Sequence, residues 1–292
     1  MINGFLRQIR GKYALNPIWE VELRRLQGGL QLLQRFGVRA LSAAIAAALG
    51  ISAFTGIQWQ LLGQLHLNIV GWSILGAIGL MLAADVAHVF TTVTHLGAEM
   101  RSGQWDLLRL TALKPQAILD AKYNSAQLRT WRILMLEISL RLFTTLLIGV
   151  PTLFVTITDI LRFTNFVDSN LLMICFVLFV QLGIAVIYVR EPWWRMRAIV
   201  AVSLAISASV RQEGYAVLAA LGMLLAIRII QVALVIGIPL FVMLIGRDTF
   251  GFAMLCLIPY MVALLYGTTF WFYNFLRVNM LRFALRYAFR SE

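Results

Sequence analysis

Long apolar segments recur along this chain, and they limit its fold more than any other feature. A helix needs about 20 mostly apolar residues to cross the hydrocarbon core of a bilayer. Hydrophobic residues make up 61% of the 292 residues and charged residues only 13%. These proportions predict an all-α polytopic membrane protein with about six transmembrane helices and exclude a globular enzyme. The apolar runs of membrane length are residues 40–57, 69–96, 133–157, 171–189 and 252–273, with a longer apolar stretch at 198–245.

The stretch 198–245 allows more than one interpretation, because it is longer than one span needs and is interrupted at Arg211, Gln212 and Glu213. If both ends of the chain lie on one side of the membrane, the number of crossings must be even. We therefore expect one crossing here, with the fourth span ending at Arg190. The surplus apolar turns are expected to form a re-entrant piece near residues 236–246, shielded by protein.

Basic residues outnumber acidic ones, 25 to 13, which gives a formal net charge of +12. They cluster beside the apolar runs, in residues 1–40, 98–132, 190–197 and 275–292. Positive charge beside spans is typical of cytoplasmic loops. We expect a multi-pass protein of the plasma membrane (inner membrane) with both termini cytoplasmic, in contact with anionic membrane lipids and not with nucleic acid. No cleaved signal peptide is visible.

An amphipathic helix is predicted before the first span. Asn16 can cap a helix that begins at Pro17, and apolar side chains then recur every three or four residues up to Phe36. Such a helix is expected to lie in the membrane interface. The predicted division of the chain is a cytoplasmic N-terminus with this helix at 1–39, a transmembrane domain at 40–274 and a basic cytoplasmic tail at 275–292.

The polar segment 98–122 separates the second and third spans and is expected to lie outside the lipid. Pro115 should end a helix, because proline lacks an N–H and disfavours a helical residue before it. A bent, rigid surface helix between two spans could pass force from a soluble partner to the membrane domain. Its apolar side chains are Trp105, Leu108, Leu110 and Leu113. The side chains expected to face solvent are Arg101, Asp106, Arg109 and Lys114.

Ionisable residues also occur inside the spans, where they are costly and point to function or to an internal partner. Asp85, His88 and His95 fall near one face of the second span. A proton path or a metal site is one interpretation, and a hydrogen-bonded polar stripe is the favoured one. Glu137 and Arg141, four residues apart in the third span, can pair with each other.

Motifs for catalysis are absent from the sequence. No G-x-x-x-x-G-K-[ST] loop is present, so ATP would have to be handled by another chain, and no G-x-S-x-G or H-E-x-x-H stretch occurs. The two cysteines, Cys175 and Cys256, suggest neither a disulfide framework nor a zinc site. We therefore expect no enzyme activity, and no catalytic, cofactor-binding or metal-binding residues.

Two segments resemble the type-2 ABC transporter permease family, whose members have the type V exporter fold. Asn16-Pro17-Ile18 followed by Glu22-Leu23-Arg24-Arg25 is similar to the elbow helix of that family. Gln104, Ala112 and Lys114 depart from its usual residues. The second matching segment contains Glu99, Gly103, Asp106, Leu107, Leu108, Thr111, Leu113, Pro115, Ile118 and Lys122.

The resemblance implies a permease subunit of an ATP-driven exporter. Substrate would pass between this chain and a second permease copy or a paralogue when partner ABC ATPase subunits, which hold ATP and magnesium, close. The resemblance implies a coupling helix between spans two and three and an elbow helix formed by Pro17, Glu22, Arg24 and Arg25. The implied ATPase-coupling residues are Glu99, Arg101, Trp105, Asp106, Leu108, Arg109, Thr111, Pro115 and Lys122.

Two other functions remain open. One is a non-transporting membrane scaffold within a larger complex. The other is an ion-coupled carrier or membrane-embedded enzyme that uses Asp85, His88 and Glu137. That function predicts that the three side chains converge in a wet cavity, whereas the exporter prediction lets them pair with neighbours.

Overall fold

The computed structural model describes residues 17–57, 59–111, 113–163, 167–210, 212–245 and 252–289, and their regular elements are all helices. This confirms the predicted all-α class. The predicted cap Asn16 lies outside the described residues, as do the side chains of Pro17, Glu22, Arg24 and Arg25.

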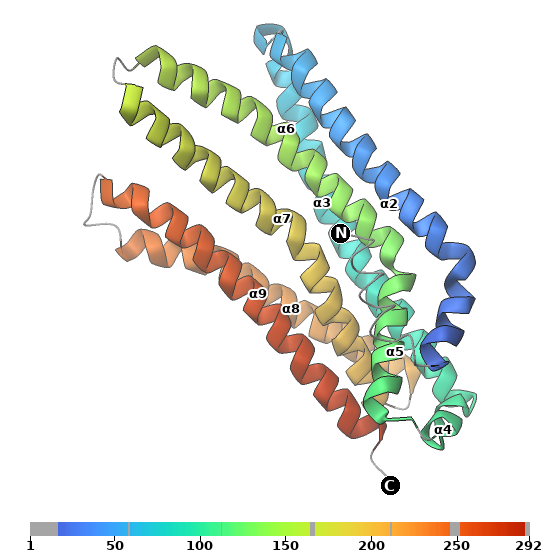
Figure 1. Cartoon of the computed structure of the whole chain (residues 1–292). Helices are drawn as coiled ribbons and strands as arrows, with labels where there is room; N and C mark the ends of the chain where they lie inside the picture. Colours follow the sequence, from blue (N-terminus) through green and yellow to red (C-terminus); the bar gives the residue numbers. More distant parts are fainter. Residues whose placement is uncertain are drawn as a thin grey trace.

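Long helices run up and down the bundle, joined by short connections (Figure 1). The beginning of α2 and the end of α9 lie at the same end of the bundle as two short helices, α4 (Gln104–Arg109) and α5 (Pro115–Arg129). We call this the α4 end, and the opposite one the far end. The long helices are α2 (Pro17–Ile57), α3 (Trp59–Arg101), α6 (Trp131–Phe163), α7 (Val167–Ser209), α8 (Glu213–Ile245) and α9 (Phe252–Ala288).

In the part of the chain that the structure describes, five helices are long and apolar enough to cross a membrane, as in a multi-pass membrane protein. The sixth predicted span, 252–273, falls in α9, a 37-residue helix whose first side chains are not among those described. The helices exceed the predicted spans: at 1.5 Å per residue, the 43 residues of α3 extend about 65 Å, roughly twice the hydrocarbon core. The five candidate segments are Arg35–Thr55, Gly63–Glu99, Trp131–Val155, Cys175–Ser209 and Glu213–Phe241.

Two predictions for the second half of the chain are wrong. The fourth span does not end at Arg190, because α7 continues to Ser209. Glu191 and Arg195, taken for part of a membrane-surface segment, are 4% and 1% exposed and pair with each other inside the bundle. Residues 236–245 form no re-entrant piece, since α8 runs unbroken from Glu213 to Ile245.

Both boundaries of the predicted division into segments fall inside continuous helices. The boundary between residues 39 and 40 falls inside α2, so the predicted interfacial helix and the first span belong to one helix of 41 residues. The boundary between 274 and 275 falls inside α9. Neither boundary coincides with an end of a helix.

Apolar packing is concentrated at the α4 end. One buried cluster there contains side chains from every helix between α2 and α7, and from α9. Among them are Leu96, Trp105, Ile118 and Ala284. At the far end, α8 and α9 stand apart from α2 and α6 (Figure 1). The described contacts therefore tie the bundle most tightly near α4 and α5.

Gly183 of α7 packs directly against the side chain of Val262 of α9. A methyl group placed on Gly183 would lie 2.7 Å from Val262 Cγ1, closer than carbon atoms pack. Small residues permit such close approaches between helices in a membrane. We predict that Gly183→Ala destabilises the protein by about 1–3 kcal/mol, the usual cost of overpacking, in thermal unfolding in detergent.

Two matched variants control this prediction. Val262→Ala should relieve the clash in the Gly183→Ala background. Gly79→Ala, where the added methyl group meets no atom within 4 Å, should be tolerated. Equal melting temperatures for Gly183→Ala and Gly79→Ala would contradict the close approach.

Candidate functional site

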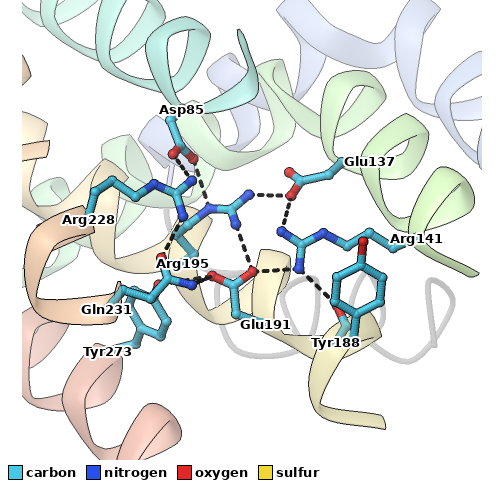
Figure 2. A network of polar contacts seen from close by, with 9 residues as sticks. All are labelled: Asp85, Glu137, Arg141, Tyr188, Glu191, Arg195, Arg228, Gln231 and Tyr273. Carbon is cyan, nitrogen blue, oxygen red and sulfur yellow. Dashed lines mark hydrogen bonds and ion pairs between the residues drawn. The ribbon is translucent and has the colours of Figure 1, made fainter. Parts of the chain in front are cut away.

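A buried cluster of charged side chains lies at the middle of the bundle and joins α3, α6, α7, α8 and α9 (Figure 2). Of the ionisable residues predicted inside the spans, Asp85, Glu137 and Arg141 belong to it. We call this set the charge cluster. It consists of Asp85, Glu137, Arg141, Glu191, Arg195, Arg228, Gln231 and Tyr273.

Arg195 is the centre of the charge cluster. Its Nε donates to Asp85 Oδ1 of α3 at 2.8 Å, and its Nη1 donates to Glu191 Oε2 of α7 at 2.7 Å. Its Nη2 donates to Glu137 of α6. The arginine is 1% exposed, so its charge is balanced by these carboxylates and not by water.

Arg141 lies beside the same carboxylates. Its guanidinium is 2.8 Å from Glu137 Oε1 and 2.8 Å from Glu191 Oε2, and it also donates to the Tyr188 carbonyl at 2.9 Å. The predicted pairing of Glu137 with Arg141 is therefore confirmed. The pair is part of a larger network that joins α6 to α7.

Arg228 extends the network to α8, and Tyr273 extends it to α9. Arg228 donates to Asp85 and, at 2.5 Å, to Gln231 Oε1. Gln231 in turn donates to Glu191 Oε1 at 3.0 Å, and the Tyr273 hydroxyl donates to the same oxygen at 2.9 Å. Asp85 and Glu191 are thus each shared by several helices.

The charge cluster is electrically balanced, because three carboxylates face three guanidinium groups. Moving a charge out of water costs several kcal/mol per ion, and good geometry with several hydrogen bonds is needed to offset that cost. This arrangement provides both. Its chemistry is that of a structural clamp, since each of its carboxylates is ion-paired with arginine.

The two histidines of α3 lie in different surroundings. His88 is 1% exposed and its Nδ1 has no hydrogen-bond partner among the described residues. His95 Nδ1 lies 3.5 Å from Glu99 Oε1, away from the charge cluster. Within the described part of the chain, no group of three or more His, Cys, Asp or Glu side chains is placed to hold a metal ion.

The predicted coupling segment 98–122 is built from three pieces. The chain turns at Gly103, whose positive φ of 71° suits glycine, and then forms the short helix α4. Lys114 is extended, and Pro115 begins α5. The prediction that Pro115 ends a helix is wrong, because α4 already ends at Arg109; the proline instead takes the favoured first position of the new helix.

Trp105 anchors α4 to the end of α9. It is 4% exposed, its Nε1 donates to the Ala288 carbonyl at 3.3 Å, and its ring lies 5.7 Å from that of Phe289. Leu107 and Leu110, in contrast, are 67% and 84% exposed. Of the predicted apolar surface, Trp105 therefore faces the bundle and Leu110 faces outward, together with Leu107, which the prediction did not include.

Glu99 and Lys122 close the segment by pairing with each other. Lys122 Nζ donates to Glu99 Oε1 at 2.5 Å, and both side chains are buried. These two predicted coupling residues therefore hold the middle of α5 against the end of α3. Thr111 and Pro115 are exposed and Leu108 is half-buried, while the side chains of Arg101, Asp106 and Arg109 lie outside the described residues.

Sequence reasoning missed Glu191, Arg195, Arg228, Gln231 and Tyr273. The first two were assigned to a membrane-surface segment because they lie among tryptophans and other arginines. Arg228 carried a usable signal, since a single arginine inside an apolar run of membrane length needs a buried partner. Nothing in the sequence around Gln231 or Tyr273 indicated that they would join the charge cluster.

Comparisons with known proteins add no assignment. No family model, no curated protein and no solved structure matches this chain. The resemblance to type-2 ABC permeases stays a prediction from the motifs, and the argument for function depends on the geometry.

We predict that Arg228 and Asp85 contribute to the stability of the protein as a coupled pair. Arg228→Gln or Asp85→Asn alone should destabilise the protein by about 3–5 kcal/mol, because each leaves an opposite buried charge undercompensated. The double variant restores neutrality, so its loss in thermal unfolding should be smaller than the sum of the single losses, with a coupling of about 0.5–3 kcal/mol. Arg132→Gln, at an exposed site of α6, is the control. Strict additivity would contradict a shared network.

A second prediction concerns the anchor of α4. Trp105→Ala should free α4 from α9, since removal of a buried tryptophan costs about 3–5 kcal/mol. Amide hydrogen exchange should rise in residues 102–111 and 284–289 while the charge cluster stays protected. Leu110→Ala removes an exposed side chain and should leave exchange unchanged. Unchanged protection in Trp105→Ala would show that α4 is held by other contacts.

Proposed function

We propose that this chain is the membrane-spanning permease subunit of an exporter driven by a separate ABC ATPase, and that α4 is the segment the ATPase contacts. The observation that carries the proposal is the geometry of α4. It is a short helix at the tip of the bundle that exposes Leu107 and Leu110 and is anchored by Trp105. A helix that transmits force needs both an outward contact and a rigid inward attachment.

The attachments of α4 reach several long helices. It follows α3 directly through the turn at Gly103, it contacts α9 through Trp105, and it precedes α5, which leads into α6. A partner that displaces α4 would therefore load three long helices together. The charge cluster joins the same helices to α7 and α8, which would carry the displacement across the bundle.

Transport in this scheme is a population shift. ATP-driven closure of the ATPase favours one arrangement of the spans, and the contact on α4 supplies the differential interaction that such a shift requires. The far ends of the helices, which stand apart in Figure 1, are the part free to rearrange. Substrate would pass between this chain and a second permease copy or paralogue.

The basic residues support an orientation. Exposed arginines of α9, Arg282 and Arg286, lie near the α4 end, as does the basic segment around Arg129. By the positive-inside rule this end would be cytoplasmic, with both termini on that side of the plasma membrane and in contact with anionic lipids. ATPase subunits would approach from there.

The ion-coupled carrier is less well supported. It predicts that Asp85, His88 and Glu137 converge in a wet cavity. Asp85 and Glu137 do belong to one cluster, but both are 0% exposed and ion-paired with arginines. Carboxylates held in this way suit the pairing that was expected of an exporter.

The test is co-purification of the tagged protein in mild detergent, with mass spectrometry to identify any ATPase. We predict that an ATPase accompanies the wild type and that Leu107→Asp with Leu110→Asp reduces its yield at least about tenfold, because burying a carboxylate in an apolar contact is costly. Both sites are exposed, so the fold should be retained.

Ser209→Asp is the matched control, since Ser209 is exposed at the end of α7, also at the α4 end. It should leave the yield unchanged. Absence of any ATPase from the wild type would favour a non-transporting scaffold subunit. An ATPase that remains bound to the doubly substituted protein would remove α4 from the contact.

A further inference from the structure

A proline interrupts the hydrogen bonding of α6 in its second half. Pro151 lies inside this helix and has no N–H, so the Leu147 carbonyl, four residues earlier, loses its helical donor. In lipid such a carbonyl needs a donor from elsewhere, because no water replaces it. His66 of α3 provides that donor: its Nε2 lies 3.1 Å from the Leu147 carbonyl, and since a carbonyl only accepts, Nε2 donates.

His66 is itself held in place by α2. The side chain is 3% exposed, and its Nδ1 lies 2.9 Å from Thr55 Oγ1. In a neutral imidazole whose Nε2 carries the hydrogen, Nδ1 is an acceptor, and the threonine hydroxyl can donate to it. His66 therefore joins α2, α3 and α6 at the one carbonyl that the proline deprives of its donor.

The next two carbonyls of α6 also accept from side chains. Thr152 Oγ1 donates to the Ile148 carbonyl at 2.6 Å, a contact that often bends a helix. Gln181 Nε2 of α7 donates to the Gly149 carbonyl and to Thr152 Oγ1, both at 2.9 Å. We call the bonds that His66 and Gln181 make to α6 the α6 latch.

A second proline shows what a rigid version of this arrangement looks like. Pro192 of α7 deprives the Tyr188 carbonyl of its donor, and Arg141 of α6 donates to that carbonyl at 2.9 Å. Arg141 is fixed by ion pairs with Glu137 and Glu191. The α6 latch holds its carbonyls through an imidazole and an amide instead, and hydrogen bonds from a guanidinium are the stronger ones.

The α6 latch lies where the packing of α6 changes. Leu134, Glu137 and Leu147 are 0% exposed, whereas beyond Leu147 none of the described side chains of this helix is buried. Phe154 and Val155 are 70% and 48% exposed. Segments with few buried contacts open at low free energy. The residues after Pro151 are therefore free to move further than the residues before Leu147.

We propose that Pro151 is a hinge of α6 and that the α6 latch sets its position. When His66 leaves the Leu147 carbonyl, residues 151–163 pivot against residues 131–147, which the charge cluster holds. The latched position is the preferred one, because the carbonyl has no other donor in lipid. The hinge is a property of this chain alone, so it adds to the proposed exporter function without depending on it.

The test measures distances between spin labels in the purified full-length protein by pulsed electron paramagnetic resonance, with both native cysteines replaced by serine. One pair spans the hinge, with labels at Leu49→Cys of α2 and Phe154→Cys of α6. The reference pair lies before it, at Val38→Cys of α2 and Leu136→Cys of α6. All four positions are exposed, so labels there disturb little packing.

His66→Leu keeps an apolar side chain but removes the donor. We expect it to shift and broaden the distance distribution of the pair that spans the hinge and to leave the reference pair unchanged. Its melting temperature should fall by about 2–4 °C, the shift expected for one lost hydrogen bond in a chain of this size.

Pro151→Ala is the matched variant, because it restores an N–H that can donate to the Leu147 carbonyl within the helix. In that background His66→Leu should no longer change the distance distribution. This result separates the hydrogen bond to the carbonyl from any packing role of the imidazole.

Three results would overturn the hinge. The first is an unchanged distance distribution in His66→Leu. The second is the same broadening with and without Pro151→Ala, which would mean that His66 acts through packing. The third is equal broadening of the reference pair, which would mean that the whole bundle loosens. None of these bears on the ATPase contact of α4, which co-purification tests separately.

Discussion

The contact of Arg195 with three carboxylates is the interaction on which the rest of the bundle depends. A guanidinium that is 1% exposed needs ion-pair partners to offset the cost of taking its charge out of water. Those partners come from α3, α6 and α7. Asp85 and Glu191 then draw in α8 and α9. Apolar side chains alone specify helix register weakly in lipid, where tails are as apolar as leucine. Here, ion pairs set the register of four helices, and the hydrogen bond of Tyr273 adds α9.

Beyond that level the two ends of the bundle are held differently. At the α4 end a buried apolar cluster, the pair of Glu99 with Lys122 and the anchor of Trp105 all reinforce the packing. Toward the far end, the described residues also join neighbouring helices: His66 bridges Thr55 and the Leu147 carbonyl, and Gln181 donates to the Gly149 carbonyl. A bundle fastened at the α4 end transmits motion from that end, because its long helices act as levers.

The sequence predicted what depends on local pattern. Apolar length predicted the long apolar helices, and spacing of four predicted the pair of Glu137 with Arg141. It failed where the meaning of a charge depends on distant helices. Arg195 looks the same in sequence whether it lies at a membrane surface or against Asp85, 110 residues earlier in the chain. The inward turn of Trp105 likewise depends on Ala288, 183 residues later, which no local pattern shows.

Two arginines of α7, two residues apart, show how the bundle distributes its charge. Arg195 belongs to the charge cluster, where carboxylates and guanidinium groups cancel, whereas no carboxylate among the described residues pairs with Arg197, whose carbonyl accepts from Tyr123 of α5. A single turn of α7 thus carries one arginine that is ion-paired and one that is not. The excess of 12 positive charges in the chain is therefore not a uniform property of its surface. Part of it lies half-buried, at Arg197 of α7 and Arg277 of α9.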